Sequence, residues 1–248
     1  MDLKQFFEQC PEAAIAFSGG VDSAYLLYAA SKYAKRVKAY YVNTAFQPQF
    51  ELDDAKRLAR DLGAEMEVLD VDILCHSAVA ANPSDRCYYC KKILFSEIIK
   101  AAKRDGFATL LDGTNASDDS SDRPGMRALA ELEVRSPLRE CGLTKTEIRE
   151  LSRAAGLFTH DKPAYACLAT RIPTGEVITA QKLHRTERSE AYLTELGFRD
   201  FRVRTVGDAA KLQVRGADMP LLMARREEIF VELKKYYSAV WLDLEVRK

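Results

Sequence analysis

The stretch Ser-Gly-Gly-Val-Asp-Ser begins at Ser18, between a short apolar run and a helical pattern. Its two glycines, Gly19 and Gly20, let a backbone approach a ligand closely, and the helix that follows presents N–H groups and the positive end of its dipole. This combination is typical of a polyphosphate site. The hydroxyls of Ser18 and Ser23 add donors, and Asp22 could hold a magnesium ion that offsets the phosphate charge. The alternative is a glycine-rich turn without a ligand.

Cysteine thiols are the second set of groups that could do chemistry. The chain has six, at Cys10, Cys75, Cys87, Cys90, Cys141 and Cys167. In a cytosolic protein they argue against a disulfide framework and in favour of core, metal-binding or reactive roles. Cys87 and Cys90 form a C-x-x-C, whose alternative interpretation is a pair of core residues at the start of a helix. Cys10 and Cys141 fit no pattern, and we interpret them as small buried hydrophobic residues.

A parallel α/β sheet would bring these groups together. Apolar runs predict strands at residues 13–20, 37–45, 64–72 and 107–115, and amphipathic patterns predict helices at residues 21–35, 49–62 and 91–104. Strands that alternate with helices form a parallel sheet covered on both faces, and its ligands bind at the carboxyl ends of the strands. The polar ends SGGVDS, NTA and DGTNASD should therefore meet in one crevice.

The pattern changes near residue 172, which predicts a second and smaller domain. From there the sequence reads as a helix, a hairpin, a second helix and a last strand, an αββαβ order with antiparallel character. We therefore predict a doubly wound α/β domain over residues 1–171. A small α+β domain for substrate binding or oligomerisation is predicted over residues 172–248.

The overall composition excludes two classes of partner. Thirty-seven basic and 37 acidic residues cancel, which argues against a bulk polyanion such as duplex DNA. Residues 1–10 lack a cationic region followed by an apolar run, and no stretch approaches the roughly 18 to 20 apolar residues that span a bilayer. We expect a cytoplasmic protein without DNA or membrane partners.

The stretch SGGVDS resembles the pyrophosphate loop of the PP-loop ATP pyrophosphatase superfamily. It lacks the Lys-Ser/Thr pair of the Walker P-loop, and it is not the dinucleotide-binding G-x-G-x-x-G. The resemblance implies an adenine nucleotide alpha hydrolase-like fold that uses ATP and Mg²⁺. In this superfamily ATP is cleaved between its α- and β-phosphates, which adenylates a carboxylate or carbonyl oxygen of the substrate. A nucleophile, usually ammonia or a sulfur species, then displaces AMP.

Four further segments resemble the LarE family, the sulfurtransferases of nickel-pincer nucleotide biosynthesis. They are NPSDRCYYCKKILF, LLDGTNASDD, RSPLRECGLTKTEIRELSRAAGL and DKPAYACLATRIPTGE, of which ACLATRIPTG is the most specific part. The resemblance implies that the substrate is pyridinium-3,5-biscarboxylic acid mononucleotide, whose carboxylates are adenylated and converted to thiocarboxylates. Cys167 aligns with the cysteine that in some members gives up its own sulfur and is left as dehydroalanine.

The same resemblance assigns ATP-binding roles to residues at three predicted strand ends. These residues are Ser18, Gly19, Gly20, Val21, Asp22, Ser23, Asn43, Thr44, Gly113, Thr114 and Asp118. Asn43 and Thr44 are expected beside the adenosine, and Gly113, Thr114 and Asp118 beside the phosphates or magnesium. Asp22 is also expected to take part in catalysis.

The C-x-x-C distinguishes this chain from the single-cysteine members of the LarE family. Three thiolates, from Cys87, Cys90 and Cys167, suit a [4Fe–4S] cluster that leaves one iron free to bind hydrosulfide. Such a cluster would carry sulfur from sulfide or a sulfur-delivery protein and would spare the protein from being consumed, so we favour it over sacrifice of Cys167. A structural zinc site completed by Cys75 or His76 is the other alternative, but it leaves Cys167 unexplained.

Arginines near and within the second domain are candidates for binding the substrate. Arg202 and Arg204 are two residues apart and so lie on one face of a predicted strand, with Arg215 nearby. We interpret these three as a clamp for the single phosphate of the substrate, which a planar guanidinium suits; a solvated sheet face is the alternative. Arg171, beside Cys167, is a candidate for binding a substrate carboxylate or stabilising the developing negative charge.

Two other functions remain open. A tRNA-thiolating enzyme would share the loop and the cysteines, but it should carry an RNA-binding appendage with a basic surface, which this sequence does not supply. A non-catalytic nucleotide sensor would keep the loop but would not need Cys87, Cys90 and Cys167. We therefore predict an ATP-dependent sulfurtransferase that acts on a small nucleotide and assembles as a homo-oligomer.

Overall fold

The computed structural model describes residues 1–118 and 124–247, which fold into two compact units. The first unit comprises Met1–Ile73 and Asp85–Lys162, and the second comprises Leu74–Ser84 and Pro163–Lys248. Each unit has its own hydrophobic core. Residues 163–171, which the sequence analysis assigned to the first domain, belong to the second unit, as does a short segment from the middle of the chain.

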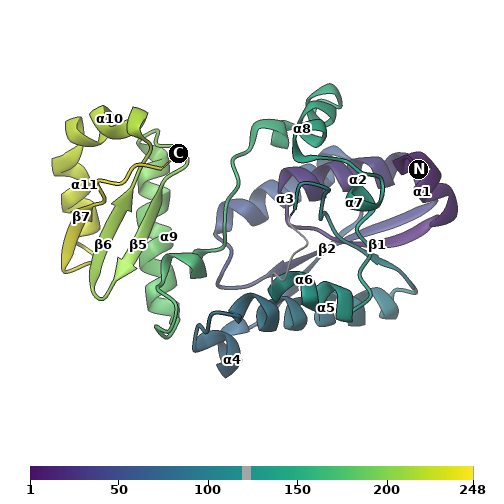
Figure 1. The fold of residues 1–248 in the computed structure, drawn as a ribbon, viewed down its shortest axis with the longest axis horizontal. Helices are drawn as coiled ribbons and strands as arrows, with labels where there is room; N and C mark the ends of the chain where they lie inside the picture. Colours follow the sequence, from purple (N-terminus) through teal and green to yellow (C-terminus); the bar gives the residue numbers. More distant parts are fainter. Residues whose placement is uncertain (119–123, 248) are drawn as a thin grey trace. The chain divides into compact units, whose positions relative to one another are not determined.

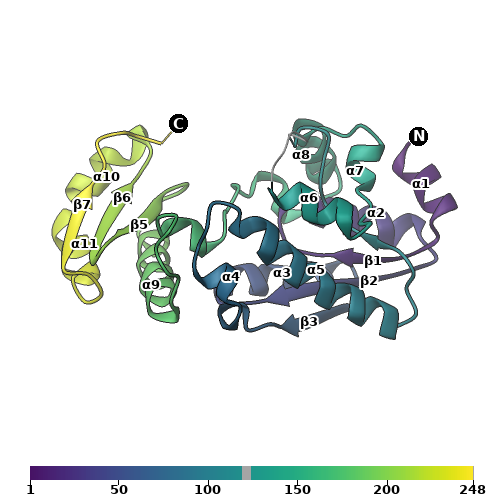
Figure 2. The same ribbon diagram turned by 60° about the horizontal axis from the view of Figure 1, so that its bottom comes forward.

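The first unit contains the predicted parallel sheet (Figure 1). Its strands are β1 (Glu12–Ala16), β2 (Arg36–Asn43), β3 (Met66–Asp70) and β4 (Leu110–Leu111), in the order β3-β2-β1-β4. All three pairings are parallel, and Figure 2 shows β1, β2 and β3 side by side. The predicted fold class, an adenine nucleotide alpha hydrolase-like α/β fold with a second small sheet, is confirmed.

Helices cover both faces of this sheet because successive strand residues point to opposite sides. Ala13 and Ile15 belong to one core and Ala14 to the other. The first core is closed by α1 (Leu3–Gln9), α2 (Val21–Tyr33), α3 (Gln49–Asp61), α7 (Pro137–Glu140) and α8 (Lys145–Ala154). The second core is closed by α5 (Arg86–Arg104), against which α6 (Pro124–Glu131) packs.

The second unit contains a three-stranded sheet in the order β5-β6-β7. Its elements are α4 (Ser77–Ala80), α9 (Ala180–Glu195), β5 (Arg202–Val206), β6 (Ala209–Gln213), α10 (Met219–Ala224), α11 (Arg226–Leu233) and β7 (Ala239–Leu242). The hairpin β5–β6 is antiparallel, whereas β7 runs parallel to β6. The predicted αββαβ order is present, but the second helix is divided in two at Arg225.

Residues 74–84 join the second unit through a buried asparagine. The Asn82 side chain is 1% exposed and donates hydrogen bonds to the carbonyl oxygens of Ile172 (3.3 Å) and Pro173 (2.7 Å). The backbone carbonyl of Asn82 accepts a 2.8 Å hydrogen bond from Gly175 N. Asn82 has a φ of 55°, a left-handed conformation that asparagine tolerates better than most residues. These bonds explain why a segment between β3 and α5 belongs to the second unit.

A network of charged residues ties β2 and β3 to the end of α5. Lys38 Nζ lies 2.8 Å from Glu67 Oε2 and 2.5 Å from Asp105 Oδ2, and Arg104 contacts the same two carboxylates at 2.7 and 2.9 Å. Hydrogen bonds from Arg104 and Lys38 hold the pKa of Asp105 well below its usual range. Those from Lys38 and Arg104 also lower the pKa of Glu67. The network therefore depends on both carboxyl groups being ionised.

We expect the free energy of unfolding to fall as the pH is lowered from about 5 to about 2. Asp105 and Glu67 have lower pKa values in the folded chain than in the unfolded chain, where such groups titrate near about 4. They therefore stabilise the fold above that pH and lose this contribution as the pH falls toward their folded values. Urea titrations at several pH values measure the effect, which Asp105→Asn should weaken and Asp61→Asn, on the exposed side of α3, should not. Identical pH dependence in the two variants would exclude this network as the cause.

Candidate active site

The SGGVDS loop connects β1 to α2 and turns on a left-handed glycine. Gly19 has a φ of +72°, and a Cβ there would lie 3.2 Å from Ala55 Cβ on α3. Ser18 Oγ and Ser23 Oγ are 3.1 Å apart, and Ser23 Oγ donates to the Gly20 carbonyl at 3.2 Å. The N-cap of α2 is Gly20, which has no side chain to cap the first turn. A 13-residue helix thus begins at this loop without a side-chain cap, as a phosphate-binding helix does.

The end of β4 packs directly on the first turn of α2. A Cβ added to Gly113 would lie 2.8 Å from Ser23 N and 3.1 Å from Ser23 Cα, both backbone atoms that cannot yield. Only glycine therefore allows this approach. Gly113, which the sequence analysis placed beside the phosphates, lies against the loop itself.

A buried aspartate that the sequence analysis missed organises the segment after β4. Asp112 is 5% exposed, and its carboxylate accepts hydrogen bonds from Thr114 Oγ1 (2.5 Å), Thr114 N (3.2 Å) and Ser136 Oγ (2.7 Å). Asp118 Oδ2 accepts a 2.9 Å bond from Asn115 N. Thr114 and Asp118 thus lie at the predicted strand end. Their hydrogen bonds to Asp112 and Asn115 stabilise the loop that follows β4.

The ends of β2 and β3 complete the carboxyl edge of the sheet. Asn43, the last residue of β2, donates from Nδ2 to Asp70 Oδ1 at 2.7 Å, and Asp70 ends β3. Thr44 is buried, and its hydroxyl donates to Gln47 Oε1 at 2.6 Å and accepts from Phe46 N at 3.0 Å. The structure therefore brings Asn43 and Thr44 to the same edge as the loop, as the parallel topology requires.

Asp22, on the first turn of α2, has one paired and one unpaired carboxylate oxygen. Oδ2 forms an ion pair with Nζ of Lys145, a residue of α8 that the sequence analysis did not single out. Oδ1 is buried and has no hydrogen-bond partner within the described residues. A buried carboxylate oxygen without a donor fits a hard cation such as Mg²⁺. Asp22 is thus a suitable ligand for the magnesium ion of the sequence prediction.

Cys87 and Cys90 lie at the amino end of α5, a helix of 19 residues. Cys87 is exposed and Cys90 half-buried, and all six cysteines of the chain carry thiols rather than disulfides. Both are thiol side chains within the first two turns of one helix, so their type and spacing fit metal ligands. Within residues 1–118 and 124–247, no group of three or more His, Cys, Asp or Glu side chains is arranged to hold a metal ion. Cys167 belongs to the second unit.

The segment around Cys167 is held by a fully buried ion pair. The Arg171 side chain is 0% exposed, and its Nε and Nη2 each lie 2.9 Å from a carboxylate oxygen of Glu190 on α9. Its Nη1 donates to the carbonyls of Ala166 (2.7 Å) and Cys167 (3.3 Å) and to Thr170 Oγ1 (2.8 Å). Burial alone would lower the pKa of Arg171, but the bonds to Glu190 raise it. Arg171 therefore contacts the backbone of the cysteine segment directly.

Two of the three predicted phosphate-binding arginines also contact this segment. Arg202 Nη2 donates to the Ala164 carbonyl at 3.1 Å, and Arg204 Nη1 donates to the Thr170 carbonyl at 2.9 Å. Burial and the nearby charge of Arg171 lower the pKa of both. Arg215 instead forms an ion pair with Asp218 at 2.9 Å. The strand register thus brings Arg202 and Arg204 to one face, next to the segment of Cys167.

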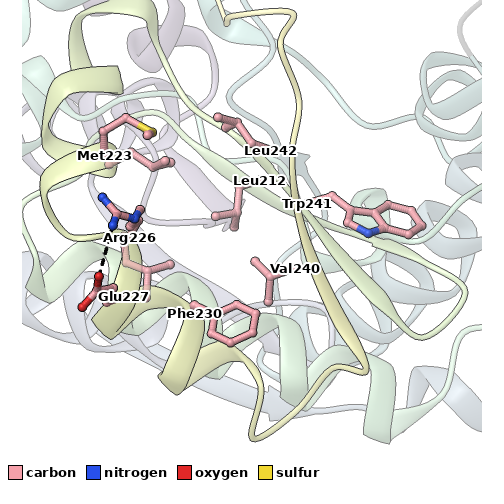
Figure 3. Close-up of a pocket in the computed structure, with 10 residues that line it drawn as sticks. Leu212, Met223, Arg226, Glu227, Phe230, Val240, Trp241 and Leu242 are labelled. Atoms are coloured by element: carbon pink, nitrogen blue, oxygen red, sulfur yellow. Dashed lines mark hydrogen bonds and ion pairs between the residues drawn. The ribbon is translucent and has the colours of Figure 1, made fainter.

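A separate apolar pocket of about 390 Å³ opens in the second unit (Figure 3). Phe230, Val240 and Leu212 point into it, and its charged lining residues are Arg226 and Glu227, whose side chains form a 3.1 Å ion pair. None of the residues singled out in the sequence lines this pocket. We therefore assign it no part in the chemistry.

The sheet order and the loop at the start of α2 define a PP-loop ATP pyrophosphatase, and the model of the queuosine biosynthesis protein QueC family matches residues 12–86. The chain is also 32% identical, over 93% of its length, to the pyridinium-3,5-bisthiocarboxylic acid mononucleotide synthase of Lactiplantibacillus plantarum, of which it covers 84%. The chain therefore belongs to the LarE family and is an ATP-dependent sulfurtransferase.

Two other relatives have higher and lower sequence identity to this chain. An uncharacterized protein of Synechocystis is 38% identical over 86% of the chain, which covers 80% of that protein. A tRNA-specific 2-thiouridylase MnmA of Thermotoga petrophila is 26% identical over 61% of the chain, which covers 54% of that protein.

In the part of the chain that the structure describes, no helix is both long and apolar enough to cross a membrane.

Proposed function

We propose that this protein adenylates the carboxylates of pyridinium-3,5-biscarboxylic acid mononucleotide and converts them to thiocarboxylates. The similarity to the L. plantarum synthase over 93% of the chain carries this proposal. The uncapped amino end of α2, with the SGGVDS loop before it, supports ATP as the activating reagent. The carboxyl edge of the sheet, from Asn43 to Gly113, supplies the surface on which the nucleotide would lie.

In the first step a substrate carboxylate oxygen attacks the α-phosphorus of ATP. The bond from that phosphorus to the bridging oxygen breaks, and pyrophosphate leaves with the electron pair. The N–H groups of the α2 first turn, with the hydroxyls of Ser18 and Ser23, would bind the phosphates. Mg²⁺, held by Asp22, would offset their charge. The expected adenosine contacts are Asn43 and Thr44, and Gly113 allows the backbone after β4 to approach the loop.

In the second step a sulfur nucleophile attacks the carbonyl carbon of the acyl-adenylate, and AMP leaves. We propose that Cys87, Cys90 and Cys167 hold a [4Fe–4S] cluster, which would supply an open iron site for inorganic sulfur. The exposed position of Cys87 and the helix amino end beneath both residues of the C-x-x-C support these two as ligands. Sulfide or a sulfur-delivery protein would then restore the sulfur. Sacrifice of the Cys167 sulfur is the alternative.

Arg202 and Arg204 are proposed to bind the single phosphate of the substrate. Their contacts with the carbonyls of Ala164 and Thr170 would then link substrate binding to the segment that carries Cys167. Within residues 1–118 and 124–247, the hydrogen bonds that Arg171 donates go to Glu190 and to this segment, so we propose that it acts by positioning Cys167. We also propose that the chain forms a homo-oligomer through the small unit.

We expect pyrophosphate release from ATP to be stimulated by the pyridinium mononucleotide and not by bulk tRNA. The tRNA substrate is the second candidate because of the similarity to the T. petrophila thiouridylase. A balanced net charge gives the chain little attraction for a polyanion, so the small substrate is favoured. The measurement is a coupled assay for pyrophosphate with each substrate in turn. A pyridinium mononucleotide without carboxylates is the control, because it has no oxygen to adenylate.

Release that depends on tRNA, with no response to the pyridinium mononucleotide, would reject the proposed substrate. Release with the control compound would show hydrolysis of ATP that is not coupled to adenylation. Mass spectrometry of the product distinguishes a thiocarboxylate from a returned carboxylate.

A further inference from the structure

Trp241, the only tryptophan of the chain, is exposed on the small sheet of the second unit. It lies in β7, the edge strand, and 49% of the residue is accessible to water. Within residues 1–118 and 124–247, its indole has no hydrogen bond and no contact with another ring or with a cation. Tryptophan is on average a highly buried residue, so an exposed indole without a partner indicates a surface that binds something.

Alternation along the strands places Trp241 on the face of the sheet opposite the core. Leu212 and Val240 belong to the hydrophobic core of the second unit. Figure 3 shows both of them pointing into the apolar pocket, whereas the Trp241 ring points away from it. Arg204 and Lys211 precede or follow core residues of their own strands by one position, so they share the face of Trp241.

The strand register aligns three of these side chains in one row across the sheet. Arg204 on β5 is paired with Lys211 on β6, and Lys211 is paired with Trp241 on β7. Neighbouring strands are about 4.8 Å apart, so the row from Arg204 to Trp241 spans about 10 Å. Arg204 also contacts the carbonyl of Thr170, in the segment of Cys167, at 2.9 Å. The row therefore leads from the proposed phosphate-binding arginine to an exposed aromatic ring.

The charges on this face differ from one end of the row to the other. Lys211 Nζ lies 2.8 Å from Asp243 Oδ2, and Gln213 Nε2 donates to the same oxygen at 2.8 Å. Asp243 follows Trp241 by two residues and so lies on the same face. At β7 this carboxylate offsets the charge of Lys211, whereas the Arg204 guanidinium at β5 has no carboxylate among its recorded hydrogen-bond partners. An anionic group is thus favoured at β5, and an aromatic cation is tolerated at β7.

We propose that Trp241 stacks on the pyridinium ring of the substrate while Arg204 binds its phosphate and Lys211 contacts that phosphate from the next strand. An indole face attracts a cation more strongly than other aromatic side chains do, and a pyridinium ring is planar and positively charged. Nucleotide-binding sheets hold bases in the same way, on exposed aromatic side chains beside basic ones. One ring suits one nucleotide, whereas sheets that bind RNA strands stack two or three bases. The role of Trp241 rests on the proposed substrate.

The fluorescence of the protein tests this proposal directly, because Trp241 is the only tryptophan. Titration with the pyridinium mononucleotide, without ATP, should quench the emission along a saturable curve, since a stacked pyridinium ring accepts an electron from the excited indole. Uridine monophosphate, whose ring is neutral, should bind more weakly. Ribose 5-phosphate, which has no aromatic ring, should leave the emission unchanged.

Substitutions at Trp241 should change the affinity for the pyridinium mononucleotide, measured by calorimetry. Trp241→Ala should reduce it about 10- to 100-fold, the range that aromatic stacking gives for one base. Trp241→Phe should recover part of the loss, because a phenyl face attracts a cation less strongly than indole. The matched control is Phe230→Ala, at an aromatic residue of the same unit that is 50% exposed and lines the pocket on the other face. It should leave the affinity unchanged, and ATP should bind equally to all these variants.

Unchanged affinity in Trp241→Ala, or no quenching in the wild-type protein, would overturn the proposal. Quenching by bulk tRNA and not by the mononucleotide would assign the ring to RNA instead. A smaller assembly in Trp241→Ala, with no quenching in the wild type, would show that a second copy of the chain covers the ring.

The proposed function can fail separately from the role of Trp241. Normal turnover of the pyridinium mononucleotide by Trp241→Ala, with an unchanged KM, would reject the stacking and retain the reaction. A wild-type protein that binds the mononucleotide with quenching, loses this affinity in Trp241→Ala and yet releases no pyrophosphate would reject the adenylation and retain the ring-binding face.

Discussion

Cys87→Ala and Cys90→Ala should lose sulfur transfer as completely as Cys167→Ala, by at least about 100-fold. The physical reason is that a cluster with three protein ligands is lost when one is removed, and even partners outside the ligand set contribute about 10- to 100-fold. The measurements are thiocarboxylate formation by anaerobically prepared protein, its iron and sulfide content, and its intact mass after many turnovers. We expect the mass of the wild-type chain to be unchanged.

Two controls separate the alternatives for the cysteines. Cys141→Ala, at a half-buried thiol whose pKa is raised chiefly by burial, should keep both activity and iron. Cys75→Ala should also keep them, whereas a zinc site completed by Cys75 would lose its metal. A chain that becomes lighter by the mass of hydrogen sulfide at Cys167, with full activity in Cys87→Ala, would reject the cluster. That result would establish a sacrificial cysteine and leave the C-x-x-C a structural role.

Asp22→Ala should abolish pyrophosphate formation and leave the fold intact. The substitution removes the carboxylate that carries the unpaired buried oxygen, and it leaves the Lys145 ammonium without its partner. We expect the rate of pyrophosphate release to fall at least about 100-fold, because one preorganised electrostatic group at a reacting centre contributes about that much. The free energy of unfolding should change by about 1 kcal/mol or less, as for other partly exposed pairs.

The matched control for this prediction is Asp53→Ala. Asp53 is exposed on α3, and its carboxylate accepts a 2.9 Å hydrogen bond from Gln49 one helical turn earlier. Both variants remove one aspartate from the first unit, but only Asp22 lies in the loop. Normal turnover by Asp22→Ala, or an equal loss in Asp53→Ala, would show that the phosphate assignment is wrong.

The sheet and its polar edge could be predicted because they depend on local pattern. The strands of a parallel sheet are short apolar runs, and their carboxyl ends meet wherever the helices between them return the chain. Gly113 was assigned to the site by the family resemblance, and the structure shows that a Cβ there would meet the α2 backbone. Arg202 and Arg204 share a strand face because they are two residues apart, and both contact one segment.

The contacts that complete the site could not be predicted because their partners are distant in sequence. Nothing local connects Lys145 to Asp22, and only the packing of α8 on α2 brings them together. The bidentate bond between Arg171 and Glu190 is likewise a product of tertiary structure. In the sequence, Glu190 has no feature that distinguishes it from other charged residues of its predicted helix. The sequence analysis predicted from its place beside Cys167 that Arg171 binds substrate, and the structure shows a buried guanidinium that is hydrogen-bonded to Glu190.

Helix α1 is an element that the pattern contained and the sequence analysis did not use. Asp2 and Gln5 have the spacing of a capping box, and the structure shows both of its hydrogen bonds. Phe6 and Phe7 are both buried, so seven residues form a helix that closes one end of the first core. The helix was not predicted because a pattern of two helical turns is too short to show a clear periodicity.

The backbone passes from one unit to the other after Ile73, after Ser84 and after Lys162. Each unit is therefore made of two separate stretches of chain, and no single cut divides them. A fragment that began at Pro163 would lack Asn82 and with it the hydrogen bonds to Ile172 and Pro173. The small unit therefore depends on a segment that lies about 80 residues before it in the sequence. A change of length or sequence in residues 74–84, just ahead of the C-x-x-C, would therefore disturb the small unit as well as the chain that leads into α5.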